Sequence, residues 1–75
     1  MNLNNLNREM INNVKREYPK GTKVVLIKMD DSQAPKIGTK GIVRSVDDAG
    51  TIHVNWEGGG SLGVVLGVDL VAKID

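Results

Sequence analysis

Metal-binding side chains are scarce in this sequence. His53 is the only histidine, and cysteine is absent. Because a zinc site needs several nitrogen or sulfur ligands, we expect no zinc site. The run Asp30-Asp31-Ser32 could begin a calcium loop, but such a loop needs a glycine at its sixth position and a glutamate at its twelfth, and neither is present. We therefore predict no metal and no cofactor.

Three glycines match a phosphate-binding motif by spacing alone. Gly58, Gly60 and Gly63 give the pattern G-x-G-x-x-G. In a dinucleotide-binding domain this pattern must open a helix. The run Val64-Val65-Leu66 that follows predicts a strand, so we interpret the match as accidental.

Catalysis by a nucleophile needs an activated side chain, a base and a group that orients the base. The sequence offers Ser32, Ser45 and Ser61 as nucleophiles and His53 as a base, but no pattern marks any of them as activated. Strand alternation also turns His53 away from the apolar side chains around it, which predicts a solvent-facing histidine. We therefore expect no enzymatic activity.

Aromatic side chains limit the ways in which this chain could bind a ligand. Tyr18 and Trp56 are the only two, and phenylalanine is absent. Grooves for proline-rich peptides, cages for methylated lysine and stacking platforms for single-stranded nucleic acid all use several rings. Trp56 shares a strand face with Ile52 and Val54, so we predict that it belongs to the core.

Charge is divided unevenly along the chain. Residues 1–23 carry five basic and two acidic residues, a net charge of +3, whereas residues 24–75 have a net charge of −2. Basic side chains could gather near the first two strands: Lys20, Lys23, Lys28, Lys36, Lys40 and Arg44. We favour scattered, solvated lysines over a phosphate-binding patch, since binding through phosphates needs many clustered cations.

The apolar spacing predicts an amphipathic helix over residues 3–17, and we divide the chain into this N-terminal helical segment, residues 1–17, and a domain over 18–75. Its apolar face carries Leu3, Leu6, Met10 and Val14. Such a helix most often caps its own domain, but it could also pair with a second copy or dock on a partner. No segment has the pattern of a signal peptide or a membrane span, so we expect a cytoplasmic protein.

After residue 21 the apolar period changes to two, which predicts β-structure. Expected strands cover 22–29, 41–46, 51–57, 61–65 and 70–74, with a single helical turn over 66–69. Val43 and Val46 differ in parity, so burial of both would require a bulge or a strong twist near Arg44-Ser45. We interpret Asp47-Asp48-Ala49-Gly50 as a solvated turn whose side chains bond the local backbone. The fold class that we predict is mostly β: a five-stranded SH3-like small barrel preceded by one helix, because closure hides the edges of so small a sheet.

Several motifs of the chain resemble a family of small domains of unknown function from phages and mobile elements of Gram-positive bacteria. They are the runs at 18–22, 38–41, 46–56 and 67–69 (YPKGT, GTKG, VDDAGTIHVNW and GVD). The run from Gly41 to Leu70 is more distantly similar to the Mind bomb type of SH3-like module. The resemblance implies an SH3-like fold and a bacterial host cell, and it transfers no catalytic residue.

These observations favour a non-catalytic protein-binding module. The resemblance implies a phage or mobile-element accessory protein, with inhibition of a host defence complex as one task. The alternatives are a nucleic-acid-binding SH3-like module and an oligomer that sequesters a small anionic ligand such as a nucleotide signal. We expect the partner to contact exposed polar residues of the loops and strands: Asp30, Asp31, Lys36, Lys40, Arg44, Asp47, Asp48, His53, Asn55 and Glu57.

Overall fold

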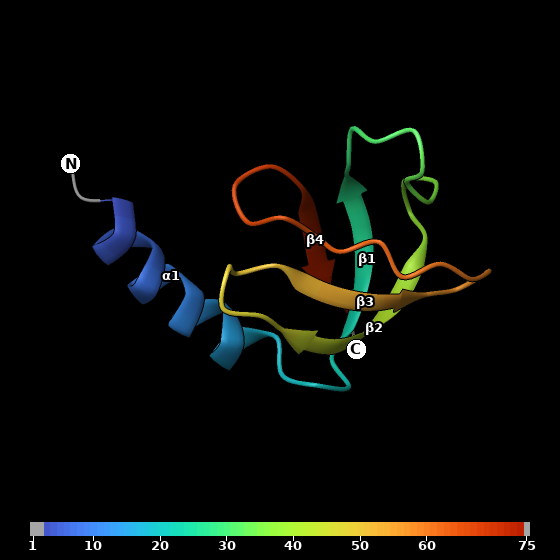
Figure 1. The fold of residues 1–75 in the computed structure, drawn as a ribbon. Coiled ribbons are helices and arrows are strands. Elements are labelled where there is room, and N and C mark those ends of the chain that lie inside the picture. The colour runs from blue at the N-terminus through green and yellow to red at the C-terminus, as the bar shows by residue number, and fades with distance from the viewer. Residues whose placement is uncertain (1–2, 75) are drawn as a thin grey trace.

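The computed structural model describes the backbone of residues 3–74 and the side chains of residues 8–74. One helix, α1 (Leu3–Glu17), precedes a single sheet (Figure 1). The strands are β1 (Lys23–Lys28), β2 (Lys40–Val46), β3 (Ile52–Trp56) and β4 (Leu70–Lys73). The helix therefore has the bounds that its apolar spacing predicts. No helix in the described part of the chain is long and apolar enough to cross a membrane.

The sheet is antiparallel throughout, in the order β3-β2-β1-β4. Alternation buries one face of each strand, as the apolar period of two predicts. The core formed by these inward side chains and by residues of the last loop contains Val24, Leu26, Met29, Val43, Ile52, Val54, Trp56, Val64 and Val71. The opposite face carries the side chains of Val25, Ile42 and Asn55 and is called the outer face below.

A close approach of β2 and β3 depends on a glycine. A Cβ atom added to Gly41 would lie 2.4 Å from Val54 Cγ1 and 2.8 Å from Trp56 Cε3. The missing side chain thus lets the largest side chain of the core lie directly against the β2 backbone.

The predicted bulge is present. The register of β2 and β3 shifts between Val43 and Ser45, so Val46 is half-buried although its parity differs from that of Val43.

The prediction of a closed five-stranded barrel is wrong: the sheet has four strands and is open. Most of the expected fourth strand, residues 61–65, is irregular, and only Val64 forms a bridge, to Ile52. One reason is that the Leu62 carbonyl accepts a hydrogen bond from Trp56 Nε1 at 2.9 Å, so a side chain takes an acceptor that a ladder would use. The expected turn over 66–69 does form, with the Asp69 amide donating to the Val65 carbonyl at 2.9 Å.

The C-terminal half of α1 attaches to one end of the sheet, and the other half extends beyond it (Figure 1). Val14 and Tyr18 pack against the core, whereas Met10 stays 38% exposed. Lys73 of β4 donates to Glu17 at 2.7 Å, and this hydrogen bond holds the pKa of Glu17 below its ordinary value. Leu3 and Leu6 lie outside the residues whose side chains are described.

Candidate functional site

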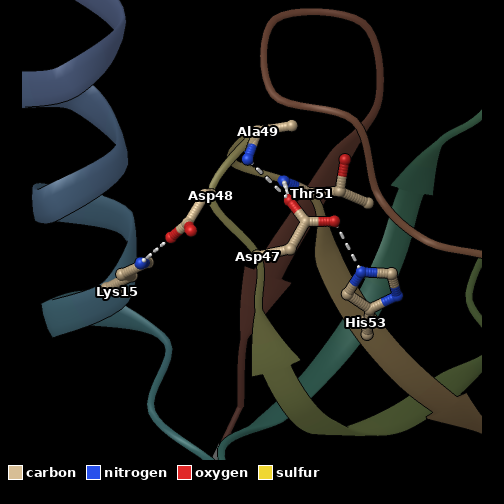
Figure 2. Close-up of polar contacts among 6 residues, drawn as sticks. All are labelled: Lys15, Asp47, Asp48, Ala49, Thr51 and His53. Atoms are coloured by element: carbon tan, nitrogen blue, oxygen red, sulfur yellow. Dashed lines mark hydrogen bonds and ion pairs between the residues drawn. The ribbon is translucent and has the colours of Figure 1, made fainter.

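Asp47 organises the turn between β2 and β3 (Figure 2). Its Oδ1 atom accepts hydrogen bonds from the backbone amides of Ala49 at 2.9 Å and Thr51 at 3.0 Å. Its Oδ2 atom lies 2.8 Å from Nε2 of His53 on β3. The predicted bonding of this turn to its own backbone is therefore confirmed, and a histidine contact is added to it.

These donors change the acidity of Asp47. The hydrogen bond from His53 is the largest cause that holds the pKa of Asp47 below its ordinary value, followed by the bond from the Thr51 amide. Each donor stabilises the ionised carboxylate, because the carboxylate is the form that accepts these bonds. His53 is 31% exposed at its side chain and is held by this contact, rather than standing free in solvent as strand alternation predicts.

The turn between β2 and β3 also contacts the helix α1. Lys15 of α1 donates to Asp48 at 2.7 Å, and Ile11 lies directly against Gly50 (Figure 2 shows the lysine contact). Gly50 has a φ of 84°, and a Cβ atom there would meet Ile11 Cγ1 at 3.0 Å. The polar groups of this turn thus bond one another and the helix. This end of the sheet is the attachment site of α1, which we call the helix seat.

Other predicted contact residues gather on the outer face. Lys40, Asn55 and Glu57 border a hollow of about 520 Å³, which we call the sheet-face hollow. Its lining is completed by Lys23, Gly41, Ile42, Trp56 and Ile74. Strand register brings these side chains together: Ile42 lies opposite both Lys23 and Asn55, and Lys40 lies opposite Val25.

A second hollow of about 650 Å³ adjoins the first and shares Trp56 and Glu57 with it. We call it the loop-end hollow. The loop between β1 and β2 contributes Gln33, Pro35, Lys36 and Thr39, and residues 57–62 contribute the other wall. The structure thus brings the loop between β1 and β2, which carries the predicted contact residue Lys36, against the segment 57–62, which begins with the predicted contact residue Glu57.

Trp56 lies between the two hollows. It is 4% exposed and bonded through its indole to the Leu62 carbonyl, so its predicted place in the core is confirmed. A buried and bonded indole fixes the position of a residue that lines both hollows.

The remaining predicted residues lie elsewhere. Asp30 and Asp31 border a third hollow of about 190 Å³, where Asp31 accepts a hydrogen bond from the Gln33 amide at 2.8 Å. Arg44 is exposed at the bulge of β2. Within the described residues, no group of three or more histidine, aspartate or glutamate side chains could hold a metal ion.

Three residues that line the sheet-face hollow are not among the predicted contact residues: Lys23, Ile42 and Ile74. Alternation against the buried Val24 and Val43 could have placed Lys23 and Ile42 on the outer face. Ile74 could not be found in this way, because its position depends on the pairing of β4 with β1, where its amide donates to the Lys23 carbonyl at 2.9 Å.

A family model described as "Domain of unknown function (DUF4314)" matches residues 7–74. No curated protein and no solved structure matches the chain.

Proposed function

The chain belongs to the DUF4314 family of domains of unknown function, and we propose that it is a non-catalytic module that binds another protein. The observation that carries the proposal is the loop-end hollow, where two connections far apart in sequence meet over Trp56. Exposed loops on a rigid sheet are the usual place for recognition.

The lining of this hollow suits a peptide chain. Pro35 and Leu62 supply apolar contacts, while Gln33 and Ser61 supply groups that can bond to a peptide backbone. The three glycines at 58–60 have no side chains that would fill the space above Trp56.

The contacts of His53 support the non-catalytic part of the proposal. Its Nε2 atom lies against Asp47, which already accepts two backbone amides. Among the described residues no hydrogen bond joins His53 to a serine hydroxyl, which a nucleophile and its base would need.

We also propose that the fold is a variant of the SH3-like type and that the protein is a mobile-element accessory factor. The order of elements supports the first point, with a long loop after β1 and a helical turn before the last strand. The motif resemblance over residues 18–74 supports the second. A host protein, such as a component of a defence complex, is then the expected partner.

An affinity capture experiment tests the function. Immobilised protein is incubated with host lysate, and retained proteins are quantified by mass spectrometry. Ser61→Arg places a long cationic side chain at the loop-end hollow, whereas Ser32→Arg makes the same change at an exposed residue of the 30–40 loop outside that lining. We expect one protein to be retained by the wild type and by Ser32→Arg, and to be lost with Ser61→Arg.

Three results would contradict the proposal. They are retention of no protein, co-purification of nucleic acid or a nucleotide in place of a protein, and equal retention by Ser61→Arg and the wild type.

A further inference from the structure

The sheet-face hollow has a charge pattern that defines its ligand. We propose that it binds an extended acidic segment of the partner protein, in which acidic side chains at positions i and i+2 lie on the same face of the chain. This inference rests on the proposed function and adds the chemistry of the partner.

The sheet-face hollow has a net positive charge. Lys23 and Lys40 border the hollow, and neither forms an ion pair with any residue whose side chain is described. Glu57 is the single acidic residue of the lining. The domain over 18–75 has seven basic and seven acidic residues, so its net charge is zero and the positive charge at this hollow is a local excess. An acidic ligand is therefore complementary in charge to this hollow.

The two lysines are spaced to match two side chains on one face of an extended chain. Lys40 lies opposite Val25, and Lys23 lies two residues before Val25 on the same face of β1. Such diagonal neighbours in an antiparallel sheet are about 7–8 Å apart. In an extended chain, side chains at i and i+2 are about 6.6 Å apart on one face. The side chains of an acidic-x-acidic segment therefore leave its backbone at about the spacing at which the two lysine side chains leave the sheet.

Apolar and amide side chains complete the recognition surface. Ile42 is 48% exposed and lies between Lys23 and Asn55 across the strands. Ile74 continues the apolar contact on the far side of Lys23. The methylene groups of the ligand's two acidic side chains can contact these isoleucines, and the Asn55 amide can both donate to and accept from a peptide backbone.

Nucleic acid fits this surface less well. Binding through phosphates gains its affinity from many cations, and this hollow has two lysines with Glu57 beside them. Single strands also need exposed rings for stacking, and Trp56 is buried.

A titration with designed peptides tests the inference on the full chain. A fluorescent peptide with a Glu-Ile-Glu centre is compared at low ionic strength with a matched Gln-Ile-Gln peptide. We expect the acidic peptide to bind at least about tenfold more tightly and to shift the NMR amide signals of Lys23, Ile42 and Asn55. The double variant Lys23→Gln/Lys40→Gln should lose this preference. The control Lys20→Gln/Lys28→Gln neutralises two exposed lysines outside the hollow and should keep it.

The outcomes separate this inference from the proposed function. Equal binding of the two peptides, equal losses in both double variants, or displacement of the acidic peptide by an oligonucleotide at equal concentration would overturn the inference. If the acidic peptide fails while a host protein is still captured in the Ser61-dependent manner, the function stands and the inference fails. If no host protein is captured either, both fail.

Discussion

Asp47 shows how one side chain can join a turn to a strand. Aspartate at the start of a turn that ends in glycine predicts bonding to the local backbone, and the amides of Ala49 and Thr51 confirm it. The contact with His53 was not predicted, because alternation gives only the face on which a side chain lies. It also depends on the register shift after Val43, which brings Ser45 rather than Arg44 opposite His53.

Replacing this carboxylate gives the first prediction. Asp47→Asn should lower the melting temperature at neutral pH by removing the charge that His53 and the two amides contact. Because folding lowers the pKa of Asp47, its stabilisation is present above its ordinary pKa and is lost as the pH falls through the lowered value. The difference from the wild type should therefore persist at pH 7 and shrink only below about pH 4.

Circular dichroism melts at several pH values measure this difference. Asp48→Asn is the matched control, since it removes only the exposed contact with Lys15 and should change the melting temperature less. A difference for Asp47→Asn that grows as the solution is acidified would contradict the sign.

Gly41 gives a second prediction at this scale. Gly41→Ala should destabilise the fold by roughly 1–3 kcal/mol, because the new methyl group would overlap with Val54 and Trp56. Urea denaturation measures the change, with Ser45→Ala, at an exposed position of the same strand, as the control. Equal stability of Gly41→Ala and the wild type would show that the strands can separate without penalty.

At the scale of elements, the local pattern predicts what local forces decide. The helix ends where the residue before Pro19 leaves the helical region, and β1 to β3 follow the alternation of Val24, Val43 and Val54. The segment 61–65 also has a strand-like composition, but its backbone competes with two side chains: the Trp56 indole takes the Leu62 carbonyl, and Asp69 takes the Val65 amide at 2.9 Å. No sequence pattern reveals this competition, because it depends on where the Trp56 and Asp69 side chains lie in the folded protein.

The indole contact gives the third prediction. Trp56→Phe keeps an aromatic ring in the core but removes the N–H donor, so it should cost about 1 kcal/mol. Hydrogen exchange in residues 60–64 should accelerate more than exchange in β1. Trp56→Ala removes the whole ring and should cost about 3–5 kcal/mol. Equal destabilisation of the two variants would contradict this prediction, because the buried aromatic ring would then add no stability beyond that of the indole hydrogen bond.

The seat of the helix gives the fourth prediction. Val14→Ala should destabilise the fold by roughly 1–2 kcal/mol, since Val14 is half-buried against the core. Asn12→Ala on the exposed side should leave stability unchanged or raise it slightly, because alanine favours helices. Thermal melts of the two variants decide the point, and equal effects would mean that α1 is not held through Val14.

At the scale of the whole molecule, polar residues predicted as one set separate into distinct places. Asp47, Asp48 and His53 serve the helix seat, whereas Lys36, Lys40, Asn55 and Glu57 border the two adjoining hollows. The sequence predicts which of these residues are exposed. It does not predict which of them are neighbours, because that depends on contacts between the 30–40 loop and the 57–62 segment.

Ionic strength gives the fifth prediction, because the binding surface is charged and the core is not. Raising the ionic strength from about 0.01 to 0.15 M shortens the screening length from roughly 30 to 8 Å. The affinity for the acidic peptide should fall over this range, while the urea midpoint of the free protein changes little. A peptide affinity that did not respond to salt would assign the binding to apolar contacts alone.

Trp56 has one further consequence for experiment. It is the only tryptophan of the chain and it lines both hollows, while its indole N–H donates to the Leu62 carbonyl. The protein thus contains an intrinsic fluorophore at the interface that we propose. Intrinsic fluorescence, excited selectively at this chromophore, should report occupancy of either hollow without a dye on the protein.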